Sequence, residues 1–182
     1  MTRLLPLLLF ALAATASAQS EVFVEQAGST FGVSTDVVIG SGAVNAQSAL
    51  NTATAGVSPA TNVAAITQEG ADNRVDLTQQ GIGNRLGLFI DGNSNQFQLS
   101  QIGSYNEFVA DVIGDGNVLG PESIQAGTGN QYTLLSDRVS GEVHSLQQYG
   151  DANQAFQVVG QGLKPASIQQ RGSGMQVMVE RR

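Results

Sequence analysis

The sequence predicts an all-β fold: a β-solenoid or cross-β stack of five strand–turn–strand coils of about 22 residues, with two facing parallel sheets. Three observations predict it. A Gly-x-x-Asn motif returns every 11 residues between Gly70 and Asn117. Between these motifs apolar and polar residues alternate, which is the two-residue period of a β-strand. A Gln stands two residues before most of the motif's glycines.

The composition of the 182-residue chain argues against several classes of protein. It has no Cys, so it has no disulfide framework and no thiolate nucleophile or metal ligand. Its single His excludes a multi-histidine centre, and no Gly-x-Ser-x-Gly or phosphate-loop motif occurs. The net charge of −7 argues against a nucleic-acid partner. We therefore expect no enzyme activity, cofactor, metal site or small-molecule substrate.

The N-terminal part of the chain divides into two segments. Residues 1–18 are a predicted secretory signal peptide, because Arg3 precedes a short apolar run and Ala16-Ser17-Ala18 supplies small residues for cleavage. The run is too short for a membrane span of about 20 residues. Residues 19–67 are rich in Ala, Gly, Ser and Thr. We expect them to be a mobile or loosely β segment, with a decayed coil as the alternative.

The Gly-x-x-Asn segments are predicted turns, because Gly and Asn tolerate a positive φ and Asn can bond its own backbone. A strand of about 6–7 residues and one turn make an arm, and two arms make a coil. Residues 68–180 then divide into the coils 68–89, 90–111, 112–135, 136–158 and 159–180. The predicted turn glycines are Gly70, Gly81, Gly92, Gly103, Gly114, Gly127, Gly150 and Gly172.

Stacking the coils places identical amides above one another. The chain has 19 Gln and 11 Asn against 23 charged residues, and stacked amides can pair where stacked like charges would repel. The predicted Gln ladder is Gln79, Gln101, Gln125, Gln148 and Gln170. The predicted Asn columns are Asn84, Asn106, Asn130 and Asn153 on one side and Asn73, Asn95 and Asn117 on the other. Ordinary solvent-facing amides are the alternative.

The unit Gln-x-Gly-x-x-Asn-x-apolar-x-x-x-Gln, repeated behind a predicted signal peptide, resembles the curlin repeat over about residues 62–182. The resemblance implies a subunit of curli, the extracellular amyloid fibres of bacterial biofilms. It implies export through a dedicated outer-membrane pore with accessory factors, and assembly with itself and other curlin subunits into an adhesive cross-β fibre. The family has a major subunit and a minor nucleator.

The last coil departs from the repeat and resembles the basic last repeat of the nucleator. Lys164 and Met175 take places usually held by Asn, and three arginines add positive charge, namely Arg171, Arg181 and Arg182. We therefore favour a nucleator-like role over the major-subunit role. Beyond residue 180 the sequence offers only two arginines to cover the final strands, so we expect an open edge that templates another chain.

Two alternatives remain at this point. A monomeric secreted β-solenoid adhesin or binding module shares the fold and the export signal, and differs in having capped ends. His144 falls in an apolar column and is expected to be a tolerated core or edge histidine, with a pH-sensing role in assembly as the alternative. The sequence alone does not decide between a fibre subunit and a binding module, or between the two roles of His144.

Overall fold

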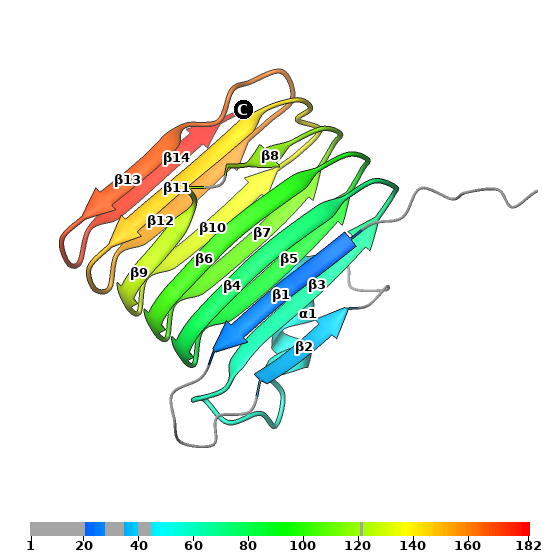
Figure 1. Ribbon diagram of the computed structural model, residues 1–182. Helices are drawn as coiled ribbons and strands as arrows, with labels where there is room; N and C mark the ends of the chain where they lie inside the picture. The colour runs from blue at the N-terminus through cyan, green and yellow to red at the C-terminus, as the bar shows by residue number, and fades with distance from the viewer. Residues whose placement is uncertain (1–20, 28–34, 40–44, 121) are drawn as a thin grey trace, which may run out of the picture.

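The computed structural model describes residues 21–27, 35–39, 45–120 and 122–182, and it is a β-solenoid of two facing parallel sheets (Figure 1). The predicted fold class is confirmed. Each sheet has seven strands, and the strands run side by side from the N-terminal end to the C-terminal end of the stack (Figure 1). The predicted signal peptide lies outside the described residues.

From β3 onward the chain alternates between the two sheets, except that β8 and β9 both lie in sheet A. Sheet A contains β1 (Glu21–Ala27), β4 (Arg74–Ile82), β6 (Gln96–Ser104), β8 (Val118–Leu119), β9 (Ile124–Thr128), β11 (Val143–Tyr149) and β13 (Ser167–Arg171). Sheet B contains β2 (Thr35–Ile39), β3 (Asn62–Glu69), β5 (Arg85–Asp91), β7 (Glu107–Ile113), β10 (Gln131–Ser136), β12 (Gln154–Val159) and β14 (Gln176–Arg181). β8 and β9 share one rung of sheet A, between β6 and β11.

The register pairs each strand in parallel with the equivalent strand of the next coil. Gln79 lies opposite Gln101, and Gln125 lies opposite both Gln101 and Gln148. The repeat period therefore sets the register, because a slip of one residue would turn the apolar residues outward. Most inward columns keep one kind of residue through the coils; His144 opposite Leu119 and Gln157 opposite Leu134 are exceptions.

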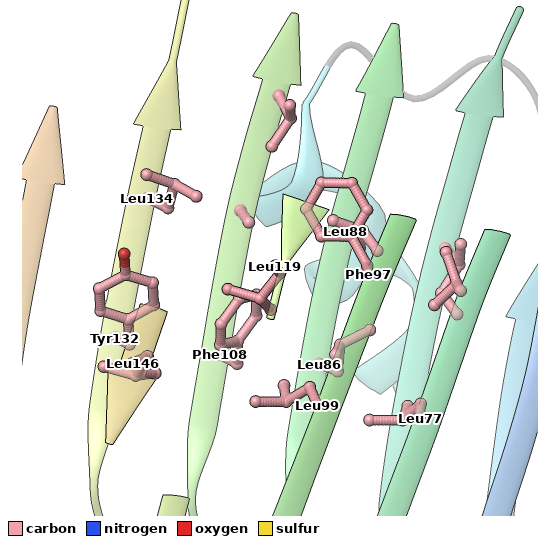
Figure 2. Packing of buried hydrophobic residues seen from close by; sticks show 14 of the residues in the cluster. Leu77, Leu86, Leu88, Phe97, Leu99, Phe108, Leu119, Tyr132, Leu134 and Leu146 are labelled. Carbon is pink, nitrogen blue, oxygen red and sulfur yellow. The ribbon is translucent and has the colours of Figure 1, made fainter. Parts of the chain in front are cut away.

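The core lies between the sheets and consists of inward-facing apolar columns (Figure 2). In sheet A, Phe97 pairs with Leu119, and Leu77 pairs with Leu99. In sheet B, Phe108 pairs with Tyr132, and the two rings lie 5.3 Å apart between centroids. These side chains are almost fully buried. Their burial supplies the main favourable term in the free energy of folding.

The turn glycines meet two separate demands. Gly81 and Gly103 have φ values of 110° and 111°, a region that L side chains rarely adopt. A Cβ at Gly81 would also lie 2.0 Å from the carbonyl oxygen of Gly103 in the next coil. Turns of successive coils therefore stack backbone on backbone. Only Gly fits this place, which explains why the motif keeps it.

Strand pairing extends upstream of residue 68, the predicted start of the coils. β3 pairs with β5, while β1 and β2 form the outer strands at the N-terminal end by pairing with β4 and β3. A helix, α1 (Ala46–Thr54), connects β2 to β3. Adjacent parallel strands need such a crossover connection. The residue pattern of this segment does not predict a helix.

Helix α1 packs on the outer face of sheet B. Its residues Ala46, Leu50 and Ala53 are buried with outward-facing residues of β3, β5 and β7. The Asn45 side chain caps the helix by accepting a hydrogen bond from the Ser48 N–H. The Ala46 N–H donates to a carboxylate oxygen of Asp111 on β7 at 2.6 Å. Burial raises the pKa of Asp111, and this hydrogen bond opposes the rise.

Candidate functional site: buried amide ladders

A continuous ladder of buried glutamines runs along sheet A. The Nε2 of each donates to the Oε1 of the next: 2.8 Å from Gln79 to Gln101, 2.9 Å to Gln125, 2.8 Å to Gln148 and 2.6 Å to Gln170. All five side chains are fully buried. A buried amide without partners would cost about 1–3 kcal/mol, so the ladder removes a penalty in every coil.

The same amides also join the two sheets. The Nε2 of Gln101, Gln125 and Gln148 donates at 2.9 Å to a backbone carbonyl oxygen of the facing strand in sheet B, namely Arg85, Glu107 and Gln131. Each Gln thus contacts the next coil through its own column and the opposite sheet through its second hydrogen. The ladder fixes the spacing of the coils and of the sheets together.

Asparagines form a second ladder at the turn that leads into sheet B. The backbone N–H of Asn106 donates to the Asn84 Oδ1 at 3.2 Å, and that of Asn130 donates to the Asn106 Oδ1 at 3.1 Å. Their Nδ2 groups donate to turn glycine carbonyls of the following coil, at 3.0 Å for Asn106 and 2.7 Å for Asn130. The buried members of this ladder are Asn62, Asn84, Asn106, Asn130 and Asn153.

Asn62 is a ladder residue that the sequence analysis missed. Its Oδ1 accepts from the Asn84 N–H at 2.9 Å, and its Nδ2 donates to the Gly81 carbonyl at 2.9 Å. No Gly stands three residues before it, because Pro59 occupies that place. The spacing of 22 residues to Asn84 is the signal that could have identified it.

The second Asn column is shorter. Asn95 donates from its backbone N–H to the Asn73 Oδ1 at 3.1 Å, and Asn117 donates to the Asn95 Oδ1 at 2.9 Å. Beyond Asn117 the next place holds Glu142, whose N–H lies 3.4 Å from the Asn117 Oδ1. This corner of the stack therefore changes its chemistry after three coils.

Both ladders have a direction along the stack. In the Gln ladder the side-chain N–H points toward the C-terminal coil, while in the Asn ladder the backbone N–H points toward the N-terminal coil. The two ends of the stack therefore present different donors and acceptors. Two like ends cannot continue these bonds, whereas opposite ends can.

The basic residues of the last coil lie at the C-terminal edge of the stack. The Met175 N–H donates to the Asn153 Oδ1 at 3.1 Å and so ends the Asn ladder. The Arg171 guanidinium lies 5.7 Å from the Tyr149 ring centroid. Arg181 donates to the Lys164 carbonyl at 2.9 Å, and Arg182 pairs with Glu180. β13 and β14 pair on one side only within the described residues.

The fourth coil has a polar core that the repeat pattern does not predict. The Tyr132 hydroxyl donates to the Gln157 Oε1 at 2.8 Å, and the Gln157 Nε2 donates to the Ala166 carbonyl at 3.1 Å. His144 lies opposite Leu119 in an inward column and is fully buried. Neither ring nitrogen has a hydrogen-bond partner among the described residues. Burial lowers the pKa of His144 to about 4, so the ring is neutral at pH 7.

In the described part of the chain, no three His, Cys, Asp or Glu residues come together as a group that could hold a metal ion. Nor does that part contain a helix with the length and apolarity of a membrane span. The arrangement that distinguishes this chain is therefore the pair of amide ladders and the edges where they end.

Comparison with known proteins agrees with the repeat. The family of the curlin associated repeat matches residues 60–81, which include β3, the turn after it and most of β4. No curated protein and no solved structure gives a significant match. The matched stretch holds Gln68, Gly70 and Asn73, the same three places that recur in the later coils. The match supports the assignment to the curlin repeat that the spacing of these residues predicts.

Proposed function

We propose that this chain is a structural subunit of an extracellular curli-type amyloid fibre and that it assembles by stacking its coils on those of other copies. The curlin repeat and the β-solenoid fold fit a structural subunit of this kind. The proposal assigns the chain no catalytic role. Its adhesive and biofilm roles follow from the fibre that it forms.

The observation that carries the proposal is the direction of the Gln ladder at the C-terminal edge. Gln170 is the last member of the ladder, and its Nε2 donates to the backbone carbonyls of Gln154 and Met175 in its own coil. On assembly, the hydrogen on Met175 would turn to a following coil, as the Nε2 of the earlier ladder members does. An incoming copy that presents its N-terminal coil would supply the next Oε1 in the same direction. Strand edges of this kind template the pairing of another chain.

Charge supports the same head-to-tail order. The C-terminal coil carries Lys164, Arg171, Arg181 and Arg182 against Glu180. Near the other end, Glu69 and Asp72 are exposed at the turn between β3 and β4, one strand inside the outer strands β1 and β2. Opposite ends therefore attract, and two C-terminal ends repel. Attraction of this kind speeds association and is weakened by salt.

Export and partners follow from the family. We infer that residues 1–18 direct secretion and that the mature chain passes an outer-membrane pore with the help of accessory factors. Its partners at the cell surface are its own copies and other curlin subunits. The basic last coil favours the nucleator role, because its departures from the repeat lie at the edge where another subunit would begin to fold.

The experiment is seeded assembly of the mature chain, residues 19–182, followed by thioflavin-T fluorescence and electron microscopy. Fibrils with a cross-β signal support the proposal. Conversion without a lag indicates the nucleator role, and a lag that preformed seeds remove indicates the major-subunit role. A soluble, protease-resistant monomer without fluorescence would overturn the proposal and favour a capped binding module.

A matched pair of variants tests the ladder at the edge. Gln170→Met removes the last ladder amide, whereas Gln169→Met changes an exposed neighbour on the same strand. We expect seeded elongation to slow roughly 5- to 30-fold in the first variant, because about one or two hydrogen bonds are lost at each addition. The second variant should elongate like the unmodified chain. Equal rates for both variants would contradict the role of the ladder in growth.

A further inference from the structure

The two sheets differ in the number of rungs that they contribute to the stack. Sheet A has six rungs, because β8 and β9 share one, whereas sheet B has seven. Among the described residues, β1 and β2 are the outermost strands at one end, and β13 and β14 are the outermost strands at the other (Figure 1). These four strands pair in parallel with their neighbours, so a second copy can continue both sheets only by a shift along the stack.

This difference creates a conflict when whole copies are stacked head to tail. The rungs of both sheets have the same spacing, so a rigid copy must shift by the same number of rungs in each. Placing β1 of the next copy beside β13 takes a shift of six rungs, and placing β2 of the next copy beside β14 takes seven. At a shift of six, β2 and β14 claim the same place.

A shift of seven rungs would avoid that clash but leave one rung of sheet A empty. The backbone groups of β13 and of the next copy's β1 would then face a gap between them, and unpaired backbone groups away from water are costly. A shift of six rungs continues both sheets without a gap if one strand of sheet B is released. The two strands that compete for the place are β2 and β14, so one of them has to leave.

β2 covers only part of the strand edge that it occupies. Its pairing with β3 runs over five residues and ends where Ile39 lies opposite Ile66. β3 continues to Glu69, so its last three residues are not paired with β2. β14 pairs with β12 over six residues. On the edge of β3, β14 would therefore form the longer pairing of the two.

β14 presents the same kind of residue as β2 at the matching register places. Val37 stands in the column of sheet B that ends in Val177, and Ile39 stands in the column that ends in Val179. Val177 and Val179 are only partly buried in the single chain. Pairing with the edge of a further strand would remove more of their apolar surface from water, which favours the exchange.

The part of β3 beyond β2 suits the end of β14. In the same register Arg182 falls beside Glu69, and both side chains are exposed and oppositely charged. Arg182 pairs with Glu180 on its own strand and would then lie between two carboxylates. Arg181 falls beside Gln68, whose Nε2 is buried without a hydrogen-bond partner. This corner of β3 is therefore incomplete in the single chain.

Helix α1 can stay in place when β2 leaves. Its buried residues pack with residues of β3, β5 and β7, and the Ala46 N–H is held by Asp111 on β7. The incoming strand would bring Met178, which is 75% exposed, beside Ala65, one of the residues buried with the helix. The exchange therefore concerns one strand and leaves the helical layer intact.

We propose that the edge of β3 binds β14 of a second copy and that β2 occupies this edge until the copies assemble. Each addition to the fibre then exchanges β2 for the neighbour's β14. β1 stays and pairs with β13 of the same neighbour, and its Gln26 stands in the register column of Gln79 that ends in Gln170. In the single chain β2 protects an edge that would otherwise template pairing. This inference rests on the proposed fibre and names the edge through which its copies meet.

The test locks one or the other competing strand with a disulfide. Val37→Cys with Ala64→Cys ties β2 to β3, and the matched pair Ala155→Cys with Val177→Cys ties β14 to β12. Neighbouring strands lie about 4.8 Å apart, within the ~4.4–6.8 Å between Cα atoms that a disulfide spans. The chain has no Cys, so only the engineered bond can form. Reduction of each variant releases the lock and provides its own control.

Seeded elongation of residues 19–182 is then measured for both variants, oxidised and reduced. The oxidised β2–β3 lock should lose elongation and regain it on reduction, while the β12–β14 lock should elongate like the unmodified chain in both states. A β2–β3 lock that elongates equally well when oxidised would overturn the exchange. Loss of elongation in the oxidised β12–β14 lock would also overturn it, because β14 is expected to keep its place. Absence of fibrils from the unmodified chain would instead overturn the fibre itself.

Discussion

The Nε2 of Gln148 donates to the Oε1 of Gln170 at 2.6 Å, and both side chains are fully buried. The residues are 22 positions apart, one coil of the solenoid. Their neighbours Gln147 and Gln169 occupy the same two strands but face outward. The same residue type therefore plays two roles on one strand, and position alone decides which side chain belongs to the ladder.

This alternation gives a direct prediction for stability. Gln148→Met leaves the Gln125 Nε2 without its acceptor and the Gln170 Oε1 without its donor inside the core. We expect a loss of about 2–4 kcal/mol in the free energy of unfolding, measured by guanidinium dissociation of assembled chains. Gln147→Met should change it by less than ~0.5 kcal/mol. Equal losses for the two variants would mean that the buried ladder adds no stability of its own.

The stacking of the turns predicts that alanine substitutions at two glycines differ in their cost to stability. Gly103→Ala would place a Cβ 2.1 Å from the Gly127 carbonyl oxygen, and Gly129→Ala would meet nothing within 4 Å. Both positions have a positive φ, 111° and 66°. We expect Gly129→Ala to cost about 1–2 kcal/mol for backbone strain alone, and Gly103→Ala ~2–4 kcal/mol more for the clash. Denaturation of both variants measures this difference, and similar costs would contradict backbone-on-backbone stacking of the turns.

The buried His144 predicts a dependence on pH. Its pKa is about 4 in the folded chain and 6.5 without the fold, so the unfolded chain binds the proton more readily between these values. The contribution of the neutral, buried His144 ring to the free energy of unfolding is fully present above pH 6.5. It is lost as the pH falls toward 4, which lowers the free energy of unfolding by about 3 kcal/mol. Because acidic residues also titrate in this range, His144→Phe is the comparison.

The measurement is the denaturation midpoint of both chains at several pH values between 7 and 4. The unmodified chain should lose stability more steeply than His144→Phe below pH 6.5. Its inward-column partner Leu119 carries no charge that could hold the ring protonated. Parallel pH profiles would show that His144 is not buried in its neutral form.

The packing of helix α1 on sheet B predicts that the helix can be displaced while the strands of the solenoid stay folded. Gly87→Val would drive a side chain into the Ala46 carbonyl and Leu50, while the inward side of β5 keeps its core contacts. We expect residues 46–54 to lose protection from hydrogen exchange and proteolysis, with the protection of β6 and β11 unchanged. The control is Thr133→Val, on the same outward column beyond the helix. Loss of protection throughout the stack would show that α1 is integral to the solenoid.

The repeat period accounts for what could be predicted from the sequence. The 11-residue spacing places Gly81 over Gly103 and Gln79 over Gln101, so the turns and ladders follow from counting residues. The repeat also fixes the register of the parallel strands, because each coil has the same sequence pattern as the one before it. The fold class therefore needed no information beyond the pattern.

The remaining features depend on contacts between residues that no period relates. Helix α1 has a capping Asn45 but few strong helix formers after its alanines, so its stability comes from packing over Gly87 and from Asp111. The Tyr132–Gln157 hydrogen bond joins two places where the repeat predicts apolar residues. Neither feature has a sequence signature, since each pairs residues far apart along the chain.

The measurement that tests the central claim most directly is cryo-electron microscopy of fibres assembled from residues 19–182. The account predicts a helical repeat with a layer line at about 4.8 Å, strands perpendicular to the fibre axis, and the last coil of each copy stacked on the first coil of the next. Gln170 would lie within hydrogen-bond distance of a Gln of the following copy. A chain that stays monomeric, or a fibre whose copies meet through other faces while the edges of β13 and β14 remain unpaired, would contradict it.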